Sequence, residues 1–314
     1  MILRPRTFAE VIDRMAALPP VTAAVAGATE RTVVEGAVLA AEAGIISPIL
    51  VGPAGRVAEV VAMVPGAEGL PVVDTGPGYA AVERSVDLVE AGEAQLLAKG
   101  HVHTAVFLRP LIHRLRTDRP VSHLFVAEMP GYPKLLGITD AAVNIAPDLG
   151  RKVALIENVV ELARSFGDGL VKVAALSAIE IVNPALASTL DGHALARMSE
   201  QGRIPGALVA GPVPFDAAVS PRAAAIKNMS SPVAGRADLV LVPDLDTGNI
   251  LAKGLAHLAG ATLAGVVLGA RVPAVLTSRS DSPHSRLVSF AVAAAQHHLA
   301  GGYRFEQHPD TGDM

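Results

Sequence analysis

The stretch that decides the fold lies near the C-terminus and reads LVLVPDLDTGNILAK over residues 239–253. Its first half is a short, continuous apolar run that ends at Pro243, which is typical of a strand buried on both faces of a parallel sheet. Its second half brings carboxylates, a hydroxyl and a glycine directly to the start of a predicted helix. In an open α/β sheet, ligands bind where strands end in this way.

The same alternation of apolar runs and alanine-rich helical stretches extends over most of the chain. We predict strands at 21–26, 49–52, 71–74, 122–126, 153–156, 172–176, 207–210, 239–243, 264–268 and 274–277. We predict helices at 30–43, 80–91 and 285–299. Repeated strand–helix units indicate an α/β protein with a parallel sheet covered by helices on both faces.

The length of 314 residues exceeds the size at which one hydrophobic core stops growing, so two domains are expected. The pattern is interrupted at two places, which assigns residues 1–141 and 285–314 to a discontinuous first domain. Residues 142–284 then form the second domain, and the cleft between the domains is the expected site. Beyond the last helix, residues 301–314 are polar and are predicted to be a frayed tail.

Composition excludes several classes of function. The formal net charge is -4 and no Lys/Arg-rich run with aromatic residues occurs, so nucleic acid is not an expected partner. The sequence has no cysteine, which excludes disulfides, thiolate metal sites and a cysteine nucleophile and fits a cytoplasmic location. The N-terminus lacks the apolar core of a signal peptide. The nearly uncharged stretch 254–270 contains four glycines that divide it into two short buried elements, so no membrane span is expected.

The junction at residues 243–253 is the first candidate site. N–H groups at the start of the predicted helix, from Thr247 to Ile250, are suited to hold a phosphate or to polarise a carbonyl, because they lie at the positive end of the helix dipole. The alternative is structural: Asp246 or Thr247 caps the helix and binds nothing.

A second strand end, after residues 274–277, leads into Ser278-Arg279-Ser280-Asp281-Ser282 and then into the last helix. Arg279 is the strongest single candidate there, because a guanidinium binds a phosphate through two parallel hydrogen bonds. The alternative is a surface ion pair between Arg279 and Asp281.

Further upstream, Lys99-Gly100-His101-Val102-His103-Thr104 precedes a helical stretch that contains Arg109. A His-x-His pair on one face of a strand suggests a metal, but no further ligand lies at a recognisable spacing, so packing or hydrogen bonding is expected instead. The glycine-rich signatures of dinucleotide and ATP sites are absent, and Ser278 does not lie in a nucleophile elbow.

These pieces, in this order, resemble the phosphate acetyltransferase and phosphate butyryltransferase family. The resemblance rests on residues 243–253, 265–273 and 277–279, and other matching segments extend it over roughly residues 20–300. It implies two α/β/α domains like those of the isocitrate and isopropylmalate dehydrogenases, a homodimer, and a site in the interdomain cleft. It further implies reversible transfer of an acetyl or butyryl group between coenzyme A and phosphate, directly within a ternary complex and without a metal or other cofactor.

The resemblance also implies residue roles. Ser278 and Arg279 match the catalytic Ser-Arg pair of the family, and Arg109 matches a phosphate-binding arginine in a pattern that begins at Thr104. The position at which acetyl-type members carry a catalytic aspartate is Ser285 here, so Asp281 is the substitute candidate for the general base, with helix capping as its alternative. The remaining predicted contacts to phosphate, acyl phosphate or coenzyme A come from the first junction, namely Asp246, Thr247, Gly248, Asn249 and Lys253.

Two other functions stay open at this point. Dehydrogenases of the same fold bind NAD and a divalent metal, although the sequence lacks a matching carboxylate cluster. A catalytically silent protein that binds coenzyme A or acyl phosphate is the other alternative, because of Ser285. The choice between acetyl and butyryl depends on pocket volume, which a sequence does not reveal.

Overall fold

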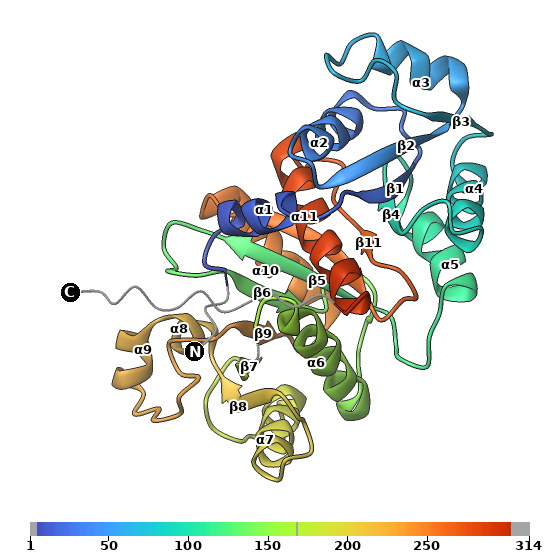
Figure 1. The fold of residues 1–314 in the computed structure, drawn as a ribbon. Coiled ribbons are helices and arrows are strands. Elements are labelled where there is room, and N and C mark those ends of the chain that lie inside the picture. Colours follow the sequence, from blue (N-terminus) through green and yellow to red (C-terminus); the bar gives the residue numbers. More distant parts are fainter. Residues whose placement is uncertain (1–4, 168, 303–314) are drawn as a thin grey trace.

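The fold is described from a computed structural model that covers residues 5–167 and 169–302 (Figure 1). The predicted tail therefore lies almost entirely outside the described residues. Strands run over β1 (Val21–Ala26), β2 (Ile46–Gly52), β3 (Val72–Asp74), β4 (Leu96–Lys99), β5 (Ser122–Glu128), β6 (Leu136–Thr139), β7 (Val171–Leu176), β8 (Ala207–Val213), β9 (Leu239–Leu241), β10 (Thr262–Leu268) and β11 (Ala274–Val275).

Helices alternate with these strands, as expected for an α/β protein. They are α1 (Phe8–Ala16), α2 (Arg31–Glu42), α3 (Ala54–Val61), α4 (Tyr79–Glu90), α5 (Thr104–Arg114), α6 (Leu149–Arg164), α7 (Ala187–Glu200), α8 (Phe215–Val219), α9 (Pro221–Ile226), α10 (Leu245–Leu258) and α11 (Pro283–Ala300).

The strands of the described chain join in one continuous sheet with the order β3-β2-β1-β4-β11-β10-β5-β6-β9-β7-β8. From β3 to β11 neighbouring strands are parallel, and so are those from β6 to β8. Between these two parallel sections the pairs β11–β10, β10–β5 and β5–β6 are antiparallel. The α/β class is confirmed. The sheet is mixed, because its central strands β11, β10, β5 and β6 pair antiparallel.

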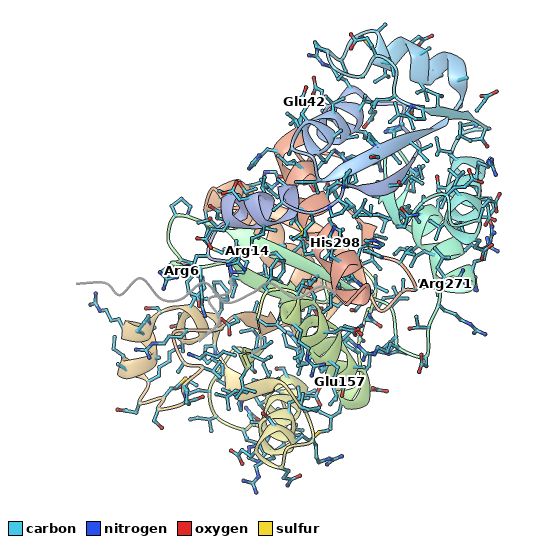
Figure 2. All side chains as sticks on the ribbon, in the orientation of Figure 1. Arg6, Arg14, Glu42, Glu157, Arg271 and His298 are labelled. Carbon is cyan, nitrogen blue, oxygen red and sulfur yellow. The ribbon has the colours of Figure 1, made fainter. Side chains whose placement is uncertain are left out.

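Helices cover both faces of the sheet. On one face, α11 lies against α2 and α1, although it comes from the opposite end of the chain (Figure 1). On the other face, α4 and α5 pack over a separate apolar cluster that includes Phe107 and Leu111. Charged side chains such as Glu42, Glu157 and Arg271 project from the outer helices and loops (Figure 2).

The helix α11 matches the predicted final helix and contacts the N-terminal half as expected. Eleven of its side chains are buried, most of them alanine, valine or another small residue, which lets the helix lie close to its neighbours. The division into domains at 1–141 plus 285–314 and at 142–284 stays a prediction.

One predicted strand is wrong. Residues 153–156 lie within the helix α6, which begins after Asp148, whose carboxylate accepts the Arg151 N–H at 2.7 Å as an N-cap. Four apolar residues in a row do not distinguish a strand from the buried side of a helix. The stretch 254–270 divides as expected into the end of α10, a turn and β10, but only β10 is buried, since Leu258 at the end of α10 is 90% exposed. Within the part of the chain that the structure describes, no helix is long and apolar enough to cross a membrane.

Candidate active site

The candidate site lies where β1, β4 and β11 end side by side, because these neighbouring strands are parallel. The loops after β1 and β4 are packed closely together: the Gly100 N–H donates to the Ala26 carbonyl at 2.8 Å. A Cβ on Gly100 would lie only 2.4 Å from the Gly27 carbonyl oxygen, so this approach requires glycine. The loop after β11 carries Ser278 and Arg279 to the same edge.

The loop from Ser278 to Asp281 is held by its own hydrogen bonds. The Asp281 carboxylate accepts the Ser278 N–H at 2.7 Å, and the two hydroxyl groups of Ser278 and Ser280 lie 3.0 Å apart. Burial raises the pKa of Asp281. The N-cap of α11 is Ser282, whose hydroxyl accepts the Ser285 N–H at 3.1 Å, so the alternative in which Asp281 caps the helix is wrong.

Arg279 is exposed at this edge and its guanidinium approaches the loop after β4. Its Nη2 lies 3.5 Å from Nδ1 of His103. No ion pair joins Arg279 to Asp281 among the described residues, so the alternative of a surface ion pair is wrong. The guanidinium stays accessible to an anion.

Arg286 is a residue that sequence reasoning missed. Its side chain is 3% exposed, its Nη1 donates to the Thr277 hydroxyl at 2.7 Å, and its Nη2 donates to the Ser278 carbonyl at 3.1 Å. Burial lowers the pKa of Arg286. Its stem packs on Gly36 of α2, where an added Cβ would lie 2.6 Å from the Cβ of Arg286. Arg286 therefore fixes the end of β11 and the start of the Ser278 loop from its position on α11.

Lys99, the last residue of β4, begins the candidate stretch 99–104, but the sequence assigned it no role of its own. It is 3% exposed, and its Nζ makes long hydrogen bonds to the carbonyls of Val102 at 3.3 Å and Gly100 at 3.4 Å. Burial, and then the positive charges of Arg286 and Arg279, lower the pKa of Lys99 to about 8. The candidate site therefore holds three cations, two of them buried.

Thr104 and Arg109 belong to α5, on the same side of the sheet as α4. Thr104 is the first residue of α5, directly after His103. Arg109 is exposed, and within the described chain it makes no hydrogen bond or ion pair; its charge opposes the rise in the pKa of Tyr79 that a hydrogen bond with Glu83 causes. The structure therefore does not bring Arg109 into contact with the Ser278 loop, and its predicted role in phosphate binding stays a prediction.

His101 and His103 diverge. His101 forms an ion pair with Glu30 in the loop after β1, whereas His103 faces Arg279. Among residues 5–167 and 169–302, no group of three or more His, Asp or Glu side chains is placed to hold a metal ion.

The junction before α10 differs from its expectation. Asp244, not Asp246 or Thr247, is the N-cap, and its carboxylate accepts the Thr247 N–H at 2.8 Å. The Gly248 N–H donates to the Asp244 carbonyl at 3.2 Å. The expectation that N–H groups from Thr247 onward are free for phosphate is therefore wrong, because the cap and the first helical turn use them. The predicted side-chain roles of Asp246 and its neighbours stay predictions.

The start of α10 and the Ser278 loop are nevertheless connected through hydrogen bonds. Asn249 Nδ2 donates to the Ala141 carbonyl at 3.2 Å, and Gly248 packs on the Asp140 backbone. The Asp140 carboxylate accepts the His123 N–H at 3.0 Å, and His123 Nε2 lies 3.3 Å from the Leu276 carbonyl, two residues before Ser278. At its other end α10 also approaches the site, since the charge of His257 lowers the pKa of Asp281 against the larger effect of burial.

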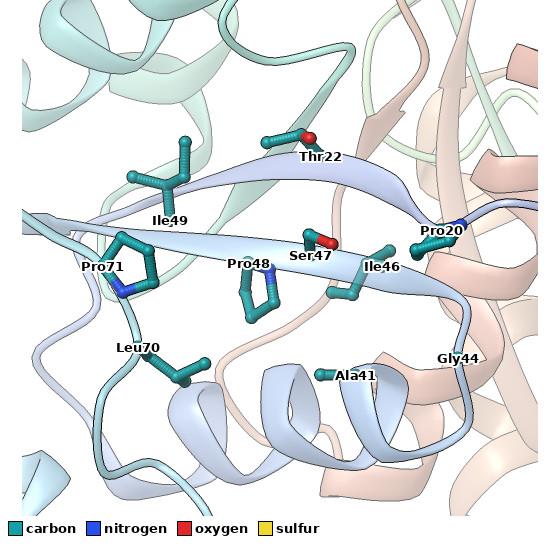
Figure 3. A pocket seen from close by; sticks show the side chains of 10 residues that line it. All are labelled: Pro20, Thr22, Ala41, Gly44, Ile46, Ser47, Pro48, Ile49, Leu70 and Pro71. Carbon is teal, nitrogen blue, oxygen red and sulfur yellow. The ribbon is translucent and has the colours of Figure 1, made fainter.

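A separate pocket of about 500 Å³ lies at the amino ends of β1 and β2, at the opposite edge of these strands from Ser278 (Figure 3). It is an open, mainly apolar hollow without a charged side chain, lined by Pro20, Thr22, Ala41, Gly44, Ile46, Ser47, Pro48, Ile49, Leu70 and Pro71. This pocket offers no chemistry, so the candidate site is the edge at Ser278.

Fold and site together define an α/β enzyme with a cation-rich edge suited to a phosphate-bearing substrate. Comparison with known proteins narrows this class. Residues 80–295 match the family model described as "Phosphate acetyl/butaryl transferase". Phosphate acetyltransferase of Rhizobium meliloti is 43% identical over 295 residues, which is 93% of each chain. Phosphate butyryltransferase of Clostridium acetobutylicum is 35% identical and covers 92% of this chain and 97% of its own. The chain thus belongs to the phosphate acetyl/butyryl transferase family.

Solved structures agree. A branched-chain phosphotransacylase from Enterococcus faecalis V583 superimposes with a TM-score of 0.77 and 31% identity, over 88% of this chain and 99% of that chain. A 4-hydroxythreonine-4-phosphate dehydrogenase from Klebsiella pneumoniae, at 16% identity and a TM-score of 0.54, covers 88% of this chain and 99% of its own and shares the fold alone. The expected fold shared with dehydrogenases is confirmed.

Proposed function

We propose that the chain catalyses the reversible reaction of acyl-CoA and phosphate to acyl phosphate and free coenzyme A. The observation that carries the proposal is the Ser278–Arg279 loop, set beside Lys99 and Arg286 at the strand ends of a member of this family. A phosphate dianion and the oxyanion that forms on the acyl carbonyl are both stabilised by such a preorganised group of cations and hydroxyls. Relatives named for acetyl and for butyryl transfer both match over most of the chain, so either short acyl group fits the proposal.

In this proposal Arg279 holds the phosphate and Ser278 donates a hydrogen bond to the developing oxyanion. Both project from the same short loop, which Asp281 and Arg286 keep in place from two sides. In this proposal Thr104 and Arg109 add to phosphate binding from α5, which begins directly after His103. The acyl group passes directly between the two substrates, and coenzyme A enters as a substrate with no metal or other cofactor.

The helix α10 supports a role in binding the larger substrate. Asn249, Lys253 and His257 follow each other at four-residue spacing and therefore line one side of the helix over about 12 Å. The line begins at the Ala141 carbonyl, which Asn249 contacts, and ends within electrostatic reach of Asp281. We propose that coenzyme A or the acyl phosphate lies along it, with Asp246, Thr247 and Gly248 at its far end.

A direct assay tests the proposed reaction. Acyl phosphates of two to four carbons are incubated with coenzyme A and the full chain, and thioester formation is followed by absorbance, before and after dialysis against EDTA. We expect thioester product with an unchanged rate after dialysis. Loss of activity on dialysis contradicts the metal-free proposal, and no product at any chain length contradicts the proposed function. NADH formation in a parallel assay would favour the dehydrogenase reading instead.

We also propose a homodimer in the cytoplasm. Ile250 and Leu258 of α10 are 71% and 90% exposed, and Gly254 between them opens to free space, so an apolar stripe runs along the helix. Leu258→Asp is expected to convert a dimer to a monomer in light scattering after gel filtration. Ile226→Asp, at an apolar side chain on α9 that is 71% exposed, is the control and leaves the mass unchanged. A monomeric wild type contradicts the proposal.

A further inference from the structure

The reaction proposed above needs a group that moves a proton. When the thiol of coenzyme A attacks acyl phosphate, its sulfur forms a bond to the acyl carbon and the bond from that carbon to the phosphate oxygen breaks. The thiol loses a proton and the departing phosphate gains one. A group that accepts the proton first and returns it afterwards balances the step, because the products are the thioester and hydrogen phosphate.

The expected carboxylate for this task is absent from its position. Ser285 stands there, and its N–H and hydroxyl both contact the hydroxyl of Ser282 at the start of α11. Asp281 is the nearest carboxylate in sequence, but one of its oxygens accepts the Ser278 N–H at 2.7 Å. That bond gives Asp281 a clear positioning task in the loop.

Lys99 is the buried candidate at this edge, whereas the imidazole of His103 is exposed beside Arg279. The Lys99 Nζ is buried at the end of β4 and contacts only carbonyl oxygens, at 3.3 and 3.4 Å. It forms no ion pair with a carboxylate of the described residues, although a buried lysine normally has one. The charged groups around it are Arg286 on α11, Arg279 and Asp281 in the loop after β11, and Glu30 before α2. These groups belong to the loops and to the first turn of α11, which together form the candidate site.

We propose that Lys99 is the proton-transferring residue of the reaction, taking the thiol proton of coenzyme A and returning it to the departing phosphate. In the reverse direction the neutral amine takes the proton of hydrogen phosphate as its oxygen attacks the thioester, and the ammonium then protonates the departing thiolate. This inference rests on the proposed acyl transfer.

The acid–base properties of Lys99 fit the task. Burial, with two arginines as neighbours, brings its pKa to about 8, close to the value of about 8.5 for a free thiol. Proton transfer is most effective between groups of similar pKa near the working pH. An ordinary exposed lysine has a pKa of about 10.4, so near pH 8 it would be almost fully protonated and unable to accept the proton.

Two variants separate proton transfer from simple anion binding. Lys99→Arg keeps a positive charge that does not ionise, and Lys99→Met removes the charge. A proton-transfer role predicts that both variants lose about 10²- to 10⁴-fold in turnover at pH 7.5. A role as a fixed charge predicts instead that Lys99→Arg stays within about tenfold of the wild type, and this result would overturn the proposal. Retention of the wild-type rate by Lys99→Met would overturn it as well.

The pH profile supplies a second readout, with both substrates far below their KM. The pKa of Lys99 is about 8 and that of the thiol is about 8.5. The wild-type rate is therefore expected to peak near pH 8.2 and to be about fivefold lower at pH 7 and at pH 9.5. Lys99→Met depends on preformed thiolate, so its rate rises about 30-fold over the same range. A profile for Lys99→Met that parallels the wild type contradicts the proposal.

Controls keep folding separate from catalysis. Lys172→Met, on β7, lies six strands away across the sheet, about 29 Å at the usual strand spacing, and is expected to leave activity unchanged. Circular dichroism and thermal melting report whether each variant folds. If both Lys99 variants fail to fold, the wild-type profile still decides: a rate that keeps rising with thiolate formation above pH 8.5 overturns the proposal. If no thioester forms even with the wild type, the proposed function itself fails.

Discussion

Replacing Gly36 with alanine tests the contact between α2 and α11 on which the candidate site rests. The added Cβ would lie 2.6 Å from the Cβ and 2.9 Å from the Cδ of Arg286. Ordinary carbon–carbon contacts are about 3.5 to 4.0 Å, so the two helices must separate by roughly 1 Å. The nearest atom is bonded to the α11 backbone, so a rotation of the arginine side chain does not relieve the contact.

The magnitude follows from two opposing effects. Overpacking in a core costs about 1–3 kcal/mol, whereas alanine in place of glycine within a helix contributes about 0.5–1 kcal/mol. We therefore expect Gly36→Ala to lower the free energy of unfolding by up to about 2.5 kcal/mol. Gly55→Ala in α3 is the matched control: an added Cβ there meets no atom within 4 Å, so the same substitution is expected to stabilise by up to about 1 kcal/mol.

Urea unfolding and steady-state kinetics measure the two consequences. Arg286 donates a hydrogen bond to the Ser278 carbonyl, so a shift of α11 moves the loop that contains Ser278. A displacement of about 1 Å in an active site lowers the rate about 10²-fold. Gly55→Ala is expected to keep the wild-type rate. Equal stabilisation by both substitutions, with unchanged turnover, would refute the reasoning and show that the helices separate without cost.

Three further predictions concern single side chains. Ser278→Ala is expected to lower turnover about 10²- to 10³-fold with little change in melting temperature, since an oxyanion donor is lost; an unchanged rate would remove Ser278 from the mechanism. Asp281 has a raised pKa, so its charged form destabilises the native state above that pKa, and the cost disappears as the pH falls through it. Asp281→Asn should therefore gain stability relative to the wild type at pH 7 and lose this gain toward pH 4, as thermal melts at both values would show; unchanged turnover would mean that the carboxylate only positions Ser278. Asp244→Ala removes the N-cap of α10 and should cost about 1 kcal/mol in urea unfolding, and a variant as stable as the wild type would contradict the assigned cap.

Much of the fold was predictable because buried parallel strands are continuous apolar runs. The runs at 21–26 and 172–176 correspond to β1 and β7 almost residue for residue. β6 was missed because it is only four residues long and contains Gly137, whose position leaves no room for a Cβ: Leu239 would lie 2.9 Å away. That requirement arises from a strand 100 residues further along the chain, so local sequence gives no sign of it.

The same distinction separates the predicted from the missed site residues. Ser278 and Arg279 follow a strand and precede a helix, which marks them in the sequence as candidates for ligand binding. Lys99 and Arg286 look like ordinary charged residues at the end of a strand and in the first turn of a helix. Arg286 is buried where α11 packs on α2, and Lys99 is buried at the end of β4, where its Nζ contacts the carbonyls of the following loop.

The two buried cations, Lys99 and Arg286, have different electrostatic roles at this edge of the sheet. A site for an acyl phosphate has to carry positive charge that is in place before the substrate binds. Buried positive charges are costly in the empty protein. Burial lowers the pKa of both Lys99 and Arg286, but only the lysine is brought near neutrality, because a guanidinium starts from a far higher value. Arg286 is therefore suited to hold the loop as a permanent charge. Lys99 is suited to change its charge during the reaction, and this is why the arginine substitution at position 99 is the decisive experiment.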